Sequence, residues 1–398
     1  MLLALASVGT LAPLHAGPEP YRNLRDTELG YHGPSDNLAS LTELRIGWFG
    51  PSDPDDPFSG DLWYAASLAI ADANAGPGLP LRLIPRWSSD PWGTGVSQLT
   101  RMVYDEQPLA LLGSIDSAAT HLAEQVVAKA QLPLVSPIAT DPSLTLAGVA
   151  WMFSCAPSDE AIARTLVDAL PAPMGVRSPF LLLSTTDHES RMCARSIMRE
   201  CSRRGYAPAL RLEFAPGTAE FGAQMRVAAE VQPQSVIIIA GADDAARLTR
   251  AVRSALGAVD ILGGPSMGRR RFHTCAGEEA DGVRFPLLFA PSEDARAAAF
   301  VARFTAARGH APDHAAALTF DAARLLAAAI REAGPNRARV RDRLIAMSPW
   351  DGIAGQIDFD GTGQNRRTAL ALGTIRDGRI IPVHTASPTA RDSSAPLP

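Results

Sequence analysis

The amino-acid sequence predicts an α/β fold built from two doubly wound lobes. Its 398 residues exceed what a single hydrophobic core usually organises, so we expect two domains. A strand–helix–strand pattern lies in the first half of the chain. A second series of alternating strands and helices runs between residues 160 and 263, and alternation of this kind predicts parallel sheets covered by helices.

The first strand–helix–strand unit lies between residues 109 and 140. Two short apolar runs, residues 109–112 and 132–136, are bounded by turn residues and predict buried strands. Helix-forming residues between them predict a helix over about residues 118–130. Such a connection makes its two strands parallel. The turns that follow the strands then open at the same carboxyl edge of the sheet, where open α/β folds bind ligands.

Two hydroxyl side chains mark this edge of the sheet. Ser117 ends the turn after the first strand, and Thr140 lies in the turn after the second strand. Their hydroxyls and neighbouring backbone N–H groups are expected to converge beside a helix N-terminus, which favours anions. The pattern therefore predicts an anion-binding position.

The other elements follow from the same apolar periodicities. In the first half we expect strands at residues 44–49, 81–84 and 151–155 and helices at residues 61–75 and 95–106. The second half predicts strands at residues 180–184, 210–214, 236–240 and 260–263, and helices at residues 160–170, 188–205, 221–230, 245–256, 294–308, 314–333 and 338–347. Residues 352–383 are interpreted as hairpin-like strands that complete the second lobe.

Composition and terminal segments narrow the class of protein. A net charge of −5, without a basic stripe, gives no reason to expect nucleic acid as a partner. Residues 1–16 are similar to a secretory signal without its basic region, and a disordered or locally packed N-terminus is the alternative. Residues 17–42 are interpreted as a linker and residues 385–398 as a disordered tail. Four cysteines predict mostly free, buried thiols, and a Cys155 to Cys275 bridge stays open.

Several segments resemble one known family. The runs GSIDSAATH and LPLVSPIATDPSLT resemble the ligand-binding lobe of type I periplasmic solute-binding proteins, in particular the branched-chain amino acid (Leu/Ile/Val) receptors of ABC importers. LRIGWFGPSDP, FSCAPSD and GIAGQIDFDGTG extend the resemblance over roughly residues 44–383. It implies two Rossmann-like lobes joined by a three-strand hinge. Lobe 1 would comprise residues 43–156 plus 290–349, and lobe 2 residues 157–289 plus 350–384.

In lobe 1 the resemblance implies a subsite for a ligand carboxylate. Ser117 matches the family's carboxylate-binding serine, and the turn Ile138, Ala139 and Thr140 matches the positions that complete this subsite. The alternative is that these turn residues cap their own helices. Phe58 matches an aromatic residue that lines the pocket, or else packs locally.

Lobe 2 departs from the amino-acid-binding pattern. Glu189 stands where the relatives have a Tyr, and Ala242 with Asp243 stands where they have an aromatic residue. Pro265 or Ser266 stands where they have a Glu that pairs with the ligand ammonium. The subsite for an α-amino group is therefore in doubt. Glu189 and Asp243 either supply replacement negative charge or cap helices.

One pattern suggests catalysis. Residues 264–268, GPSMG, fit the G-x-S-x-G nucleophile elbow, which makes a serine hydrolase at Ser266 a remote alternative. The elbow needs a helix directly behind the serine, and the basic run at residues 269–271 predicts a poor buried helix. That run is interpreted as a solvated loop, with contact to an anionic ligand or partner as the alternative.

Metal chemistry finds little support in the sequence. The first loop is acidic but lacks the spacing and closing Glu of a calcium-binding EF-hand, so we expect it to be solvated. Its carboxylates are Asp53, Asp55, Asp56 and Asp61. Three histidines lack the spacing of a catalytic triad or a metal site: His273, His310 and His314.

We therefore expect a binding protein and not an enzyme. The function predicted is that of an extracytoplasmic receptor that captures a small carboxylate-bearing ligand between its lobes and presents it to the permease subunits of an ABC importer. The ligand would be an amino acid, an amide, or an aromatic or aliphatic acid. No metal, cofactor or nucleic acid is expected, and the chain would be a monomer or a weak dimer. A ligand-sensing regulatory domain of the same fold is the alternative from another class.

Overall fold

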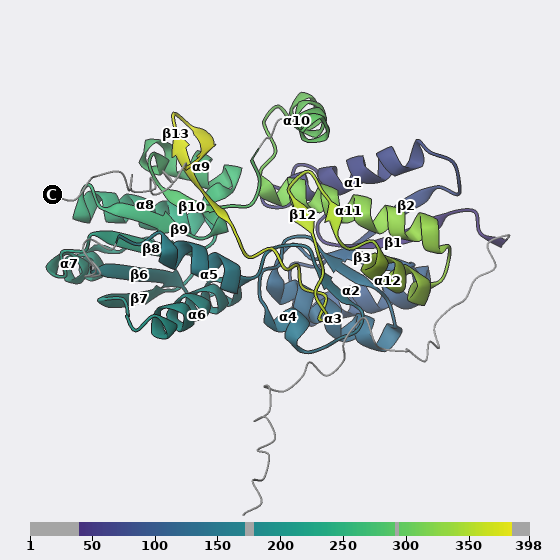
Figure 1. The fold of residues 1–398 in the computed structure, drawn as a ribbon, viewed down its shortest axis with the longest axis horizontal. Helices are drawn as coiled ribbons and strands as arrows, with labels where there is room; N and C mark the ends of the chain where they lie inside the picture. Colours follow the sequence, from purple (N-terminus) through teal and green to yellow (C-terminus); the bar gives the residue numbers. More distant parts are fainter. Residues whose placement is uncertain (1–39, 172–178, 291–293, 384–398) are drawn as a thin grey trace, which may run out of the picture.

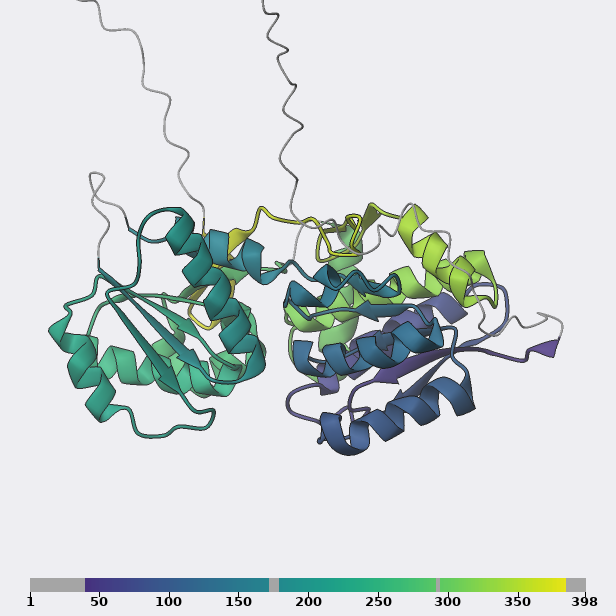
Figure 2. The same ribbon diagram turned by 90° about the horizontal axis from the view of Figure 1, so that it is seen from below.

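The protein consists of two α/β lobes that lie side by side (Figures 1 and 2). The computed structural model describes residues 40–171, 179–290 and 294–383. The expected signal and disordered tail, and most of the expected linker, lie outside these residues. Within them, the predicted fold class of two doubly wound lobes is confirmed.

The first lobe contains a five-stranded parallel sheet with the order β2-β1-β3-β4-β5. Its strands are β1 (Leu44–Phe49), β2 (Leu81–Arg86), β3 (Ala110–Gly113), β4 (Leu134–Ser136) and β5 (Met152–Ser154). Helices cover both faces of the sheet, which is why the short β3 and β4 strands are wholly buried. One face carries α1 (Gly60–Asn74), α10 (Ala295–Arg308), α11 (His314–Ala333) and α12 (Arg337–Ala346), and the other carries α2 (Val96–Arg101), α3 (Ser117–Ala130) and α4 (Ser143–Leu146).

Helix α11 organises the core of the first lobe. It begins at Asp313, whose carboxylate accepts hydrogen bonds from two backbone N–H groups of the first turn, and it ends at Gly334, which has φ of +71°. Small and aliphatic residues line most of the helix and are buried between α1 and the sheet. A side chain such as Ile330 is fully buried, so hydrophobic burial holds this helix in place.

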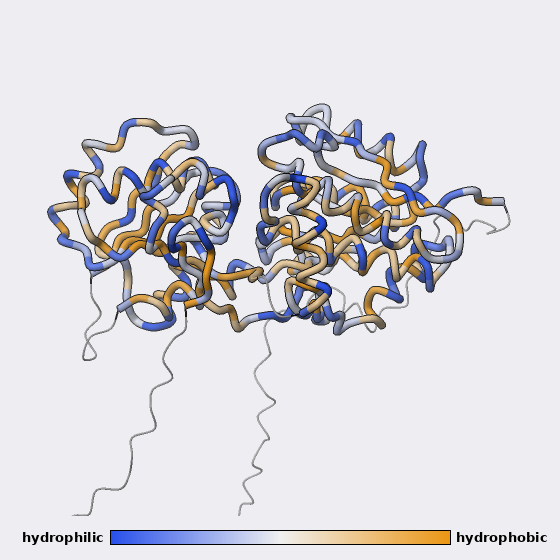
Figure 3. The backbone as a smooth tube through the Cα atoms, turned by 90° about the horizontal axis from the view of Figure 1, so that it is seen from above, coloured by the Kyte–Doolittle hydropathy of each residue, from blue (hydrophilic) through white to orange (hydrophobic). Residues whose placement is uncertain are grey.

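The second lobe contains a seven-stranded sheet with the order β14-β13-β10-β9-β8-β6-β7. Its strands are β6 (Phe180–Thr185), β7 (Leu210–Phe214), β8 (Ser235–Ile239), β9 (Asp260–Gly263), β10 (Arg284–Leu287), β13 (Ala371–Arg376) and β14 (Arg379–Pro382). The helices are α5 (Asp159–Asp168) and α6 (His188–Arg203) on one face and α7 (Gly222–Glu230), α8 (Ala242–Leu256) and α9 (Arg270–Ala276) on the other. In both lobes the central strands are hydrophobic (Figure 3).

The chain passes between the lobes at three connections. These join β5 to α5, β10 to α10, and the segment after residue 365 to β13. No helix in the described ranges is long and apolar enough to span a bilayer.

Residues 350–359 lie in the first lobe, and the prediction that the second lobe resumes at residue 350 is wrong for this stretch. Here β11 (Trp350–Asp351) pairs with β12 (Gln356–Ile357) in a small separate sheet. Phe359 is 1% exposed and its ring packs against Phe153 of β5, with centroids 5.2 Å apart. Burial of these apolar residues on the first core decides where the segment lies.

A buried carboxylate also anchors this segment. Asp321 of α11 accepts hydrogen bonds from the backbone N–H groups of Ile353 and Ala354, both at 2.8 Å. Only β13 and β14, which pair antiparallel with each other, join the second sheet as predicted.

The four cysteines are free thiols. Cys155 is 0% exposed in the first core, whereas Cys275 is half-buried at the edge of the second core. The bridge between them that the sequence left open is not formed.

A buried arginine ties α12 to the unit that carries β3 and α3. Arg337 is 4% exposed and donates hydrogen bonds of 3.0 Å to the carbonyl oxygens of Pro108, before β3, and Ala130, at the end of α3. A buried carbonyl that loses its donor costs about 1–3 kcal/mol.

We predict that Arg337→Met lowers the free energy of unfolding by about 3 kcal/mol, because it leaves two buried carbonyls without this donor. Urea denaturation measures the change. The matched control is Arg339→Met on the exposed side of the same helix, which should change stability by less than about 0.5 kcal/mol. Equal losses in the two variants would contradict the assignment.

Candidate ligand-binding site

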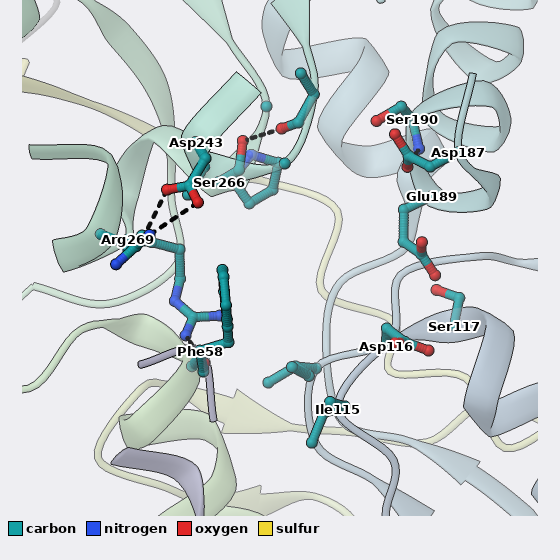
Figure 4. Close-up of a pocket in the computed structure, with 18 of the residues that line it drawn as sticks. Phe58, Ile115, Asp116, Ser117, Asp187, Glu189, Ser190, Asp243, Ser266 and Arg269 are labelled. Atoms are coloured by element: carbon teal, nitrogen blue, oxygen red, sulfur yellow. Dashed lines mark hydrogen bonds and ion pairs between the residues drawn. The ribbon is translucent and has the colours of Figure 1, made fainter. Parts of the chain in front are cut away.

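A cleft of about 730 Å³ lies between the two lobes. Turns at the carboxyl ends of strands in both sheets line it, as expected for open parallel sheets (Figure 4). Of the residues predicted from the sequence, those that line it are Ser117, Ile138, Thr140, Phe58, Glu189, Ala242, Asp243 and Ser266.

The turn between β3 and α3 positions Ser117. Gly113 has φ of +136°, and a Cβ there would lie 2.8 Å from the carbonyl oxygen of Phe49, so this turn requires glycine. Asp116 caps the helix by accepting a 2.7 Å hydrogen bond from the N–H of Ala119. Ser117 is therefore the first helical residue and not the cap, and the alternative that it caps its own helix is wrong.

The turn after β4 presents only two of its three predicted residues to the cleft. Ile138 and Thr140 line the cleft and are half-buried. Ala139 is 2% exposed, packs into the first lobe and accepts a hydrogen bond from Ser154. Its assignment as a cleft residue is wrong, because the backbone turns its methyl group into the core.

Glu189 reaches from the second lobe to the first. Asp187 caps α6, so Glu189 is not needed as a cap of its own helix. Its Oε1 accepts a 3.0 Å hydrogen bond from the N–H of Ala118, and Figure 4 shows its carboxylate directed toward Ser117. The carboxylate of Glu189 thus occupies the anion-binding position that the sequence predicts at the start of α3.

Two more carboxyl groups make this wall of the cleft acidic. Burial and the neighbouring charge of Glu189 raise the pKa of Asp116 to about 6. Burial raises the pKa of Asp159, which is 1% exposed, to about 7, although a hydrogen bond from Thr140 opposes the rise. Both groups exchange protons near neutral pH.

The opposite wall carries arginines. The guanidinium of Arg271 pairs with Asp243 through contacts of 2.7 and 3.0 Å, lowers the pKa of that carboxyl, and lies 5.0 Å from the ring centre of Phe58. Arg269 donates to Asp313 at 2.7 Å and to the carbonyl of Phe58 at 3.0 Å. The interpretation of this basic run as a solvated loop is wrong, since Arg270 begins helix α9 and the side chains of Arg269 and Arg271 contact Phe58 of the first lobe.

Ser266 has the geometry of a structural hydroxyl. It lies in a 3-10 turn, Pro265–Gly268, and its Oγ donates a 2.6 Å hydrogen bond to the carbonyl of Ala240. In the described part of the chain it bonds to no histidine or carboxylate, so no base is set to activate it. Contrary to the sequence prediction, helix α9 follows this turn. Burial of Phe272, which is fully buried, stabilises it.

Two carboxylates of the acidic first loop have partners within the protein. Asp56 accepts hydrogen bonds from Phe58 and Ser59, and Asp61 pairs with Arg308 at 3.1 Å. Asp53 and Asp55 are exposed, as the sequence predicts for a solvated loop. These contacts account for Asp56 and Asp61.

Several residues that line the cleft were not predicted from the sequence. Asp116, Asp159 and Arg247 line the cleft, although no sequence motif identifies them as binding residues. One cluster, formed by His121, Asp141 and His188, is assembled from three parts of the chain and has no sequence spacing that would reveal it.

Comparisons with known proteins agree with this architecture. Residues 43–379 match the family model of the periplasmic binding proteins. Comparison with curated protein sequences gives no significant match.

Solved structures of other binding proteins share the fold. The isoleucine complex of LivJ from Streptococcus pneumoniae has a TM-score of 0.74 and 22% identity, over 85% of this chain and 97% of that one. The leucine-binding protein LivK from Thermotoga maritima has a TM-score of 0.76 and 20% identity, over 87% of this chain and 99% of that one. A solute-binding protein from R. palustris in complex with benzoate has a TM-score of 0.72 and 18% identity, over 86% of this chain and 95% of that one. The resemblance found in the sequence is confirmed: the chain belongs to the periplasmic binding protein family.

Proposed function

We propose that this protein is an extracytoplasmic receptor that captures a small solute between its lobes and delivers it to the permease of an ABC importer. The observation that carries the proposal is the cleft of about 730 Å³, which both lobes line and which contacts bridge on two sides. A solute that touches both walls binds the closed form best and so favours closure. Two of the similar structures hold isoleucine and benzoate.

The ligand class that fits the cleft is a compact carboxylate with an apolar body. Its carboxylate would take the place of Glu189 at the N–H of Ala118, beside the hydroxyls of Ser117 and Thr140. The remainder would contact apolar side chains of the first lobe. Those that line the cleft are Trp87, Ile115, Ile138 and Phe58.

A binding role without catalysis is part of this proposal. The hydroxyl of Ser266 is committed to a backbone carbonyl and, among the described residues, has no base beside it.

A thermal-shift screen of amino acids, aliphatic amides and aromatic carboxylates tests the proposal. A ligand at 100 times its dissociation constant should stabilise the fold by about 2.7 kcal/mol. The double variant Ser117→Ala with Thr140→Ala should lose most of this shift for the same ligand.

The control is Thr100→Ala with Ser202→Ala, two exposed hydroxyls on helices outside the cleft lining, which should keep the full shift. A folded wild type that no compound stabilises would contradict the receptor function. An equal shift in both double variants would remove Ser117 and Thr140 from the subsite.

We predict that Glu189→Gln raises the affinity for a carboxylate ligand about tenfold, because a competing and repelling negative charge is removed from the subsite. Titration calorimetry measures the change. Glu160→Gln is the control, since Glu160 also lies in the first turn of a second-lobe helix but is exposed and outside the cleft lining. Weaker binding in Glu189→Gln would show instead that Glu189 contacts a cationic group of the ligand.

We predict that carboxylate affinity rises as the pH falls from 8 to 5.5. Asp159 takes up a proton near pH 7 and Asp116 near pH 6, so the acidic wall loses negative charge over this range while the ligand carboxylate stays ionised. Calorimetry at constant ionic strength measures the slope. Asp159→Asn should flatten its upper part, and an affinity that falls with the pH would contradict the assignment.

A further inference from the structure

Two histidines and one aspartate converge where the lobes meet, outside the lining of the cleft. His121 lies on α3 and Asp141 follows β4, both in the first lobe, whereas His188 is the first residue of α6 in the second lobe. The Nε2 atoms of His121 and His188 lie 3.0 and 2.9 Å from the same carboxylate oxygen, Oδ2 of Asp141. The ligand atoms of all three residues lie within 4.8 Å of one another.

This geometry is close to that of a metal centre. Two imidazole nitrogens and one carboxylate oxygen suit zinc and related divalent transition metals. In a tetrahedral zinc site with bonds of about 2.0 Å, ligand atoms are separated by about 3.3 Å. The separations of 3.0 and 2.9 Å between Asp141 and the two histidines therefore need to widen by only a few tenths of an ångström to match this geometry. With no ion present, ring protons can bridge the same atoms.

Neighbouring side chains orient these three residues, as the hydrogen-bonding partners of metal ligands do in metal sites. Glu124 is 6% exposed, and its Oε2 lies 3.5 Å from Nδ1 of His121, so that ring turns Nε2 toward Asp141. Metal-bound histidines commonly have such a carboxylate behind them. Asp141 is 1% exposed, and its other oxygen, Oδ1, accepts hydrogen bonds from Ser143, which directs Oδ2 to the histidines.

We propose that His121, Asp141 and His188 bind one divalent transition-metal ion of the zinc type, which joins the two lobes. A water molecule would complete the coordination. Because one ligand comes from the second lobe, only the closed arrangement offers all three, and the ion stabilises closure by its affinity for that state. His188 is adjacent to Glu189, which bonds to α3 at the cleft, so the ion holds together the same two helices that form the acidic wall.

The site differs from the ligand cleft in chemistry and position, and the proposal does not depend on the solute. None of the three residues lines the cleft. Zinc binding in the absence of any solute is therefore the expected result, whether or not the protein delivers a solute to a permease.

Titration of metal-free full-length protein with Zn²⁺, and absorption spectroscopy with Co²⁺ as a probe, test the proposal. The expected result is one Zn²⁺ per chain and a visible Co²⁺ band typical of nitrogen and oxygen ligands, without comparable binding of Mg²⁺. His121→Ala and His188→Ala should each abolish the Co²⁺ band. Glu124→Gln should weaken Zn²⁺ binding by about 10- to 100-fold.

The matched control is His310→Ala, because His310 lies 3.5 Å from Asp61 in a pair that has only one histidine. It should bind Zn²⁺ as the wild type does, and circular dichroism checks that each variant is folded. Unchanged Zn²⁺ binding in the folded His121→Ala variant would overturn the site. Full affinity in His188→Ala, with loss in His121→Ala, would overturn the link between the lobes.

Discussion

The N-terminus of α3 is the feature on which the cleft depends. Its first amide groups have no partners within the helix, and they open at the carboxyl edge of a buried parallel sheet. In this structure Asp116 satisfies the N–H of Ala119 from within the turn, and Glu189 satisfies the N–H of Ala118 from the other lobe. A backbone requirement of one lobe is thus met by a side chain of the second, which couples lobe closure to occupation of the anion-binding position.

In the closed arrangement, charged side chains of both lobes come together at the two walls of the cleft. On one side Glu189 faces Asp116 and Asp159, whose raised pKa values show the cost of gathering buried carboxyl groups. On the other side Arg269 and Arg271 are paired with carboxylates and contact Phe58. A ligand held between the closed lobes must replace the hydrogen bond that the N–H of Ala118 donates to Glu189. This requirement favours a small solute with one carboxylate over a purely apolar one.

Side chains that connect the lobes come from positions next to the cleft residues in sequence. Asp141 follows Thr140, and His188 precedes Glu189. Neighbouring residues at a helix start point in different directions, so one faces the cleft while the other faces the contact between the lobes outside the cleft. This arrangement places the cluster of His121, Asp141 and His188 beside the ligand site without making it part of that site.

The sequence by itself determined the alternation of strands and helices, the parallel sheets and the turns that carry Ser117 and Thr140, because period and turn residues are local properties. Tertiary structure decided the rest. Residues 350–359 lie in the first lobe because their apolar side chains are buried on its core, and Ala139 lies inside the first lobe because its methyl group packs there. The contact of Glu189 with Ala118 joins residues 71 positions apart, and no local pattern specifies a pairing that forms only when two lobes meet.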